Sequence, residues 1–223
     1  GAAQQRTEAE LAELRRALDG ASSPATGTLA ARQQLENRLD GLDQLRTDVT
    51  RASDLTPIQV IDRYGELIGQ AHALDRALLR EIRTPGTAGL ADALTATMDA
   101  AEALALQHTV LAVVIRTGEV QDSDRTLVAD TEHAIRAASS EYGLALTTDQ
   151  LQRFGAFNDE AGHARRNELR EAILATPPQT PVTVAIEDWN SAYETSKQQV
   201  EQAADRLRGE RETLTRRAEE RAS

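Results

Sequence analysis

WNSAYETSKQQVEQAADRLRGERETLTRRA, residues 189–218, is the stretch of the chain that decides the fold class. Apolar side chains recur in it every seven residues, and others fill the second half of the same stripe: Tyr193, Val200, Leu207 and Leu214, then Trp189, Ala203 and Ala218. No proline and only one glycine interrupt it. A seven-residue apolar repeat needs a partner helix to cover it. The stretch therefore predicts a long helix in a helical bundle.

The two ends of the chain predict a domain taken from a larger protein. The apolar stripe gives way to charged residues over 216–221, while the chain starts at Gly1 and has its only methionine at Met98. We therefore expect a single domain over residues 1–223. Its C-terminal stalk helix, over 183–221, is expected to continue toward other parts of the protein.

Composition narrows the fold and the partners. Of the 223 residues, 40% are hydrophobic but only 3% are aromatic, so leucine, alanine, valine and isoleucine must form the core, as in closely packed helices. The net charge of −11 repels phosphate backbones, so we expect no nucleic-acid partner. Without cysteine, the chain has no disulfide, thiol nucleophile or thiolate metal site. The sequence contains no run of about 18 consecutive apolar residues, so it predicts no membrane span.

Turn residues divide the chain into helical blocks. Glycine, proline and serine clusters separate stretches whose apolar residues step by three and four, and no stretch alternates with period two. We expect an all-α fold of long antiparallel helices crossing at roughly 20°. A first group of helices should end near residue 118, and a second should cover 119–223. The predicted helices are 7–18, 29–53, 57–82, 87–116, 124–142, 147–175 and 183–221.

The sequence contains no recognisable catalytic or metal-binding motif. It lacks a zinc-protease motif, a phosphate-binding glycine loop and a nucleophile elbow, and its four histidines lie on different predicted helices. We therefore predict no catalytic residue, no metal and no cofactor. The many carboxylates are expected to be a solvated helical surface.

Two polar residues fall on apolar stripes. Arg46 follows Leu42 in the core register of the second helix, and His108 lies between Leu104 and Leu111 on the fourth. A buried guanidinium requires a partner, because an unpaired charge inside a protein is very costly. The partner is either a carboxylate of the same fold or a bound anion. As a third possibility, the arginine lies at the end of the bundle and its side chain reaches water, so that it needs no partner.

Several short motifs follow one another in a characteristic order. They are ELRRAL at 13–18, LAAR at 29–32, LDQLRTDV at 42–49, YGELI at 64–68, LTTDQ at 146–150 with Phe154, and Trp189 at the start of the final helix. In this order and spacing they resemble the nitrate- and nitrite-sensing domains of bacterial receptors. The resemblance covers most of the chain. It implies an all-helical fold in which two four-helix bundles share long helices.

The resemblance also implies a ligand, a small planar anion held by arginines from different helices. A planar guanidinium can present a forked pair of donors to such an anion. Arg46 corresponds to the arginine of the family's Leu-Arg motif, and Arg15 or Arg16 to that of its first motif. On the first helix these two arginines flank the apolar stripe, so one of them could reach the interior or both could be solvated.

The fourth helix departs from the family pattern. The family usually has Glu-Arg there, and counting back ten residues from Gly118 gives Gln107-His108 instead. A neutral histidine is a poor anion ligand, whereas a protonated one could serve. The predicted ligand-binding residues are therefore Arg15, Arg16, Arg46, Gln107 and His108. The ligand is a nitrate-like anion or another small molecule.

Family members of this arginine-rich composition resemble extracellular sensors of actinobacterial membrane histidine kinases. Some belong to conservon systems, in which the kinase-like sensor is grouped with a small GTPase. The resemblance implies transmembrane helices on both sides of the domain, a cytoplasmic kinase and, when tethered, a homodimer. The chain itself would sense a ligand and catalyse nothing.

Two alternatives stay open from the sequence. The first is a cytoplasmic regulator, in which the same sensing domain is fused to an RNA-binding antiterminator. The second is a ligand-free bundle that mediates dimerisation or protein contacts, which the seven-residue repeat of the final helix supports equally well.

Overall fold

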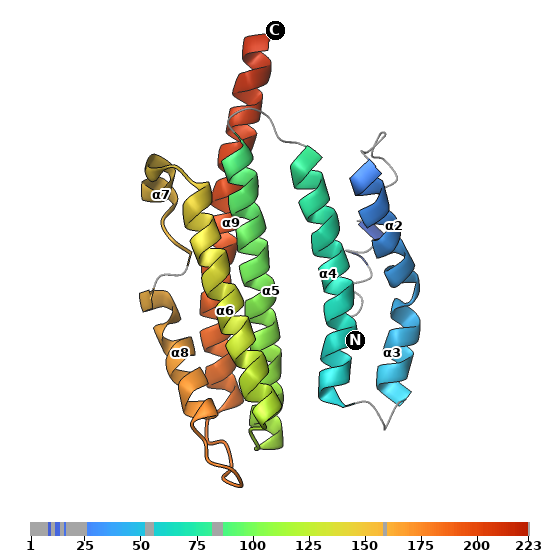
Figure 1. Ribbon diagram of the computed structural model, residues 1–223, viewed down its shortest axis with the longest axis vertical. Helices are drawn as coiled ribbons and strands as arrows, with labels where there is room; N and C mark the ends of the chain where they lie inside the picture. The colour runs from blue at the N-terminus through green and yellow to red at the C-terminus, as the bar shows by residue number, and fades with distance from the viewer. Residues whose placement is uncertain are drawn as a thin grey trace. The chain divides into compact units, whose positions relative to one another are not determined.

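The computed structural model describes residues 26–51, 56–81, 87–157 and 160–222, with the single positions 9, 12, 13 and 16. Its helices are α2 (Thr26–Asp40), α3 (Leu42–Arg51), α4 (Pro57–Glu81), α5 (Ala88–Thr117), α6 (Asp122–Ala145), α7 (Thr148–Phe154), α8 (Glu160–Leu174) and α9 (Ile186–Ala222) (Figure 1). These described residues contain no strand, so the predicted all-α fold is confirmed. The arrangement in two four-helix bundles stays a prediction.

The helices form two compact units. Unit 1 comprises Gly1–Asp54 with Arg63–Ile82, and unit 2 comprises Leu55–Asp62 with Arg83–Ser223. The contacts therefore join α5 to the helices that follow it, whereas the sequence suggested a grouping that ends near residue 118. The expectation of one functional domain stays a prediction.

Unit 1 is built on a small apolar interface between α2 and α4. Leu35 and Leu39 of α2 are buried with Leu74 of α4. The helix predicted across α2 and α3 is broken at Gly41, whose N–H donates to the carbonyl of Arg38 at 3.2 Å, three residues back. In a continuous α-helix the N–H of Gly41 would donate to the carbonyl four residues back. Here it donates to the carbonyl three residues back, and this tighter turn separates α2 from α3.

Unit 2 is centred on α5, which packs against α6 and α9, while α8 packs on α9. Among the described residues, α5 is the one helix long and apolar enough to cross a membrane. Since its sides contact α6 and α9, we interpret it as the core helix of the unit. The main buried cluster of unit 2 consists of Val110, Leu111, Val114, Val128, Leu169, Ile173, Trp189 and Ala192.

The apolar stripe of α9 finds its partners inside unit 2. Trp189, Val200, Ala203 and Leu207 are all buried there. Further along, Leu214 is only partly buried, and the last turns of α9 extend beyond the ends of α5 and α6 (Figure 1). The partner helix that the seven-residue repeat predicts is therefore supplied by the same chain over most of its length.

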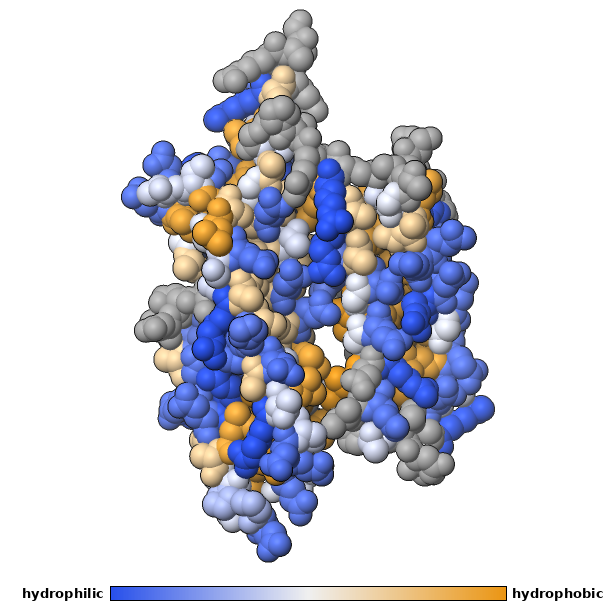
Figure 2. Space-filling model, viewed as in Figure 1, coloured by the Kyte–Doolittle hydropathy of each residue, from blue (hydrophilic) through white to orange (hydrophobic). Residues whose placement is uncertain are grey.

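Glycines and a threonine set the other helix ends. Gly118 closes α5 in the left-handed conformation, with φ of 77°, as its position predicted. Thr147 caps α7, its side chain accepting the N–H of Gln150. The helix predicted over 147–175 instead divides into α7 and α8, because Gly155 takes a positive φ of 71°. Outside this core the visible face is mostly hydrophilic, in keeping with the acidic composition (Figure 2).

Candidate functional site

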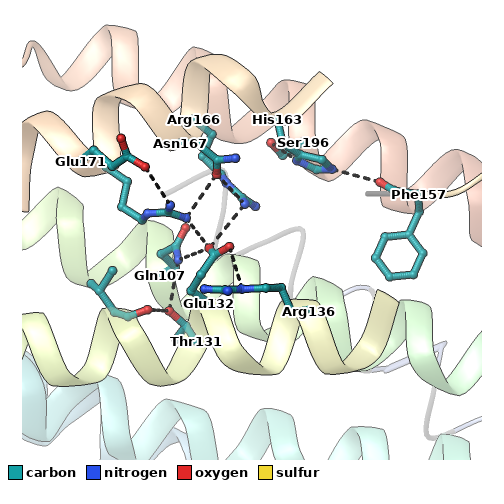
Figure 3. Close-up of polar contacts among 12 residues, drawn as sticks. Gln107, Thr131, Glu132, Arg136, Phe157, His163, Arg166, Asn167, Glu171 and Ser196 are labelled. Carbon is teal, nitrogen blue, oxygen red and sulfur yellow. Dashed lines mark hydrogen bonds and ion pairs between the residues drawn. The ribbon is translucent and has the colours of Figure 1, made fainter. Parts of the chain in front are cut away.

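A buried polar cluster joins α5, α6 and α8 inside unit 2 (Figure 3). Gln107 of α5 is fully buried, and its Nε2 donates to Thr131 Oγ1 at 3.2 Å and to Glu132 Oε2 at 3.4 Å. Both acceptors belong to α6, which packs along α5. The buried amide nitrogen of Gln107, a residue that the sequence analysis named from the family pattern, thus finds its acceptors on a neighbouring helix.

Glu132 is the centre of this cluster. Its Oε2 accepts from Arg170 Nη1 and lies 3.6 Å from Arg166 Nη2, and both arginines belong to α8. Its Oε1 lies 3.7 Å from Nε of Arg136, whose side chain is largely exposed. Asn167 Oδ1 accepts from Arg166 Nη2 at 3.1 Å and from Arg170 Nη1 at 3.2 Å. One carboxylate therefore serves several donors.

The buried charges of this cluster do not balance. The exposed fraction of the side chain is 2% for Arg166, 13% for Arg170 and 14% for Glu132. Two guanidinium cations thus share one enclosed carboxylate, because Glu171, the other acid near Arg170, is largely exposed. The enclosed part of the cluster carries an excess positive charge of about one.

Several donors and acceptors of the cluster have no hydrogen-bond partner among the described residues. They are Nε and Nη1 of Arg166 and Oε1 of Gln107. A buried donor without a partner costs free energy comparable to a lost hydrogen bond. Burial lowers the pKa of Arg166 to about 10; Glu132 opposes this shift and Arg170 adds to it. The guanidinium therefore stays charged at neutral pH, and its burial is not fully compensated.

Chemically, the cluster suits a small oxyanion. Nε and one Nη of a guanidinium form a planar fork that matches two oxygens of a planar anion. In Arg166, Nε and Nη1 lack partners, and Nη2, which forms the fork with Nε, is bound to Asn167 Oδ1. An anion at this fork would balance the excess charge, give Nε an acceptor and replace Asn167 at Nη2. Among the described residues, no group of three or more His, Cys, Asp or Glu could hold a metal ion.

His108 faces α9 rather than the cluster. Its Nε2 lies 2.8 Å from Asn190 Oδ1, and its ring stacks on Tyr193 with centroids 4.0 Å apart. Its carbonyl accepts the indole N–H of Trp189 at 3.1 Å. The predicted pair Gln107-His108 therefore makes contacts in two directions, Gln107 to α6 and His108 to α9.

The comparison with known families fits this chemistry. The family model described as nitrate and nitrite sensing matches residues 1–212. The chain belongs to the nitrate- and nitrite-sensing family. This membership confirms the resemblance and implies a small-molecule ligand. No curated protein and no solved structure gives a significant match to the chain.

The other predicted ligand residues of this nitrate- and nitrite-sensing domain lie in unit 1. Arg46 is on α3, has a side chain that is 21% exposed, and pairs with Asp43 of its own helix at 3.1 Å. Arg16 is exposed, and its Nε donates to the carbonyl of Ala12 at 3.3 Å. Arg15 lies outside the described residues. Since Arg46 belongs to unit 1 and His108 to unit 2, a pocket that uses both stays a prediction.

The sequence analysis did not single out the arginines of α8, although a signal for one of them exists. His163, Arg166, Leu169 and Ile173 step by three and four along α8 and are all buried. Arg166 therefore occupies an apolar stripe in the same way as the arginine predicted at position 46. The flanking charges over 165–171 conceal this pattern, because they make the segment look solvated.

Proposed function

We propose that this chain is the ligand-sensing domain of a membrane-bound sensor histidine kinase, on the extracellular face of the membrane. It binds nitrate or nitrite and passes the signal through its terminal helices. Its membership in the nitrate- and nitrite-sensing family supports the ligand class. The chain acts by binding, and the catalytic activity belongs to the kinase of the parent protein.

One observation carries the proposal for the binding site. Arg166 is buried beside Glu132 and Arg170 with two donor nitrogens unpartnered and one positive charge in excess. Nitrate and nitrite are planar anions whose oxygens accept a forked pair of N–H donors. Binding would offset the desolvation of Arg166, so the free energy of the buried charge favours the occupied state.

The residues predicted from the sequence give a rival location for the same anion. In that prediction Arg46, with Arg15 or Arg16 and His108, holds the anion. Arg46 already pairs with Asp43, and that carboxylate is 91% exposed, so this pair is a weak competitor for an anion. The two locations are distinguished by which arginine the binding requires.

Calorimetric titration of the purified 223-residue chain with nitrate and nitrite, with chloride as the control, tests the proposal. We expect saturable binding of the planar anions and none of chloride. Arg166→Gln should abolish the heat while Arg46→Gln retains it; the reverse result would move the site to unit 1. No heat from nitrate or nitrite up to millimolar concentration would refute the proposed ligand.

The parent protein is proposed on the resemblance. A sensor kinase requires apolar spans of about 20 residues on both sides of the domain in the complete gene. Their absence, with an RNA-binding module after the domain, would favour the cytoplasmic antiterminator alternative. A conservon-type parent would be encoded beside a small GTPase.

The alternative of a ligand-free bundle that mediates dimerisation was based on the seven-residue repeat of the final helix. The seven-residue repeat that suggested it is buried in unit 2 at Trp189, Val200 and Leu207. A homodimer of the tethered receptor would therefore use other surfaces, including the last turns of α9.

A further inference from the structure

Gln107 and His108 connect the polar cluster to the C-terminal helix within one turn of α5. Consecutive residues of an α-helix point about 100° apart. Gln107 accordingly contacts α6 through Thr131 and Glu132, whereas His108 contacts α9. A small rotation of α5 at this level would move both sets of contacts together.

The contacts of His108 fix the position of α9 along α5. Its ring nitrogen lies near Asn190, its ring stacks on Tyr193, and its carbonyl accepts from the fully buried indole of Trp189. Asn190 and Tyr193 are three residues apart, hence on one face of α9. A shift of α9 by even a fraction of a turn would break the ring stack and both hydrogen bonds.

The contacts of Gln107 depend on the charge of the cluster. Its amide donates to Glu132 at the long distance of 3.4 Å, and its Oε1 has no partner. An anion held by Arg166 would compete with Glu132 for the guanidinium groups. The carboxylate and the Gln107 amide would then rearrange, because the hydrogen bonds differ between the empty and occupied states. A ligand shifts a conformational equilibrium only through such differential contacts.

We infer that Gln107 and His108 form the coupling element of this sensor. The hydrogen bonds of Gln107 change with the charge of the Arg166 cluster. His108 is the positioning residue that transmits the resulting movement of α5 to α9. This inference rests on the proposed anion site but concerns a different property, the response of α9 to the state of the cluster. His108 thereby has a role that does not require it to touch the anion.

The chain contains no cysteine, so an introduced pair can be labelled selectively. Spin labels at Ser140→Cys on α6 and Glu212→Cys on α9, both exposed positions of unit 2, report the movement of the last turns of α9. We expect nitrate to shift the distance between the labels by roughly 1–2 Å, the usual size of helix shifts in switching proteins.

His108→Leu should separate binding from response. We expect the nitrate dissociation constant to stay within about threefold of the original value, while the shift between the labels disappears. His108→Phe, which keeps a ring for Tyr193 to stack on, should restore part of the shift. Thr109→Ala is the matched control, because Thr109 is exposed and bonds only to its own helix.

A second variant tests the coupling without any added anion. Gln107→Glu places a second carboxylate in the cluster, next to Glu132. It adds the negative charge that a bound anion would bring, and it should shift the label distance in the same direction as nitrate. In the His108→Leu background the same change should have no effect on α9. This measurement is informative even if the chain binds no nitrate, so failure of the proposed ligand and failure of the coupling are distinguishable.

Two results would overturn the coupling role. The first is a label shift that persists in His108→Leu, whether nitrate or Gln107→Glu causes it. The second is loss of nitrate binding in a folded His108→Leu protein, which would make His108 a ligand residue. The far-UV circular dichroism of each variant establishes that it is folded.

Discussion

Arg46 of unit 1 and Arg166 of unit 2 both occupy apolar helical stripes, and the structure treats them differently. Arg46 is 21% exposed and pairs with Asp43, a carboxylate in water. Arg166 is 2% exposed and shares Glu132 with a second arginine. A core position alone therefore does not leave a guanidinium short of acceptors; the surrounding helices must also enclose it, as they do for Arg166.

The surrounding helices explain the difference. In unit 1, Arg46 pairs with Asp43, three residues earlier on the short helix α3. Solvent there lowers the free-energy cost of keeping the guanidinium charged. Unit 2 buries Arg166 of α8 beside Glu132 of α6, and burial lowers the pKa of Arg166 to about 10. The first arginine needs nothing further, whereas the second gains from any anion that reaches it.

The largest expected effect comes from removing the shared carboxylate. Glu132→Gln leaves two enclosed cations without a counter-charge, and breaking a buried pair in this way costs about 3–5 kcal/mol of unfolding free energy. Asp43→Asn, the matched change in unit 1, should cost at most about 1 kcal/mol. Urea unfolding followed by circular dichroism measures both values. Equal losses would mean that the two arginines are equally solvated.

A smaller effect, of opposite sign, is expected when the arginines themselves are replaced. Arg166→Met removes an incompletely compensated buried charge, and such replacements are neutral or stabilise by about 1–4 kcal/mol. Arg46→Met should change the unfolding free energy by less than about 0.5 kcal/mol. The same urea experiment measures both, and calorimetry checks that only Arg166→Met abolishes nitrate binding. A strong destabilisation by Arg166→Met would show that the cluster serves the fold alone.

The helices were largely predictable because their ends carry local signals. Pro57, Gly118 and Thr147 set the boundaries where the sequence placed them. The breaks at Gly41 and Gly155 were missed, since the apolar spacing continues past each glycine. A single glycine is tolerated inside a helix, so only the tertiary structure decides whether the helix continues.

The site was less predictable because its defining property is a shortage of partners. His108 stood out as a polar residue on an apolar stripe, and Gln107 as part of a departure from the family pattern. The sequence could not show that they face α9 and α6 respectively. Arg166 was hidden among charged neighbours, and its missing acceptors exist only in the folded arrangement. Spacing along one helix identifies a polar core position, whereas the neighbouring helices determine what that position binds.

The smallest expected effect separates Arg166 from His108 as the source of positive charge. Burial lowers the pKa of Arg166 only to about 10, so its guanidinium is charged throughout pH 6 to 8.5. If Arg166 holds the anion, the nitrate dissociation constant should change less than about twofold over this range. Histidines in general lose their charge between about pH 5 and 8. If a protonated His108 held the anion instead, affinity would fall by up to about tenfold per pH unit, and His108→Asn would remove that dependence. Calorimetry at several pH values decides between them, because nitrate keeps its charge across the range and only the protein can titrate.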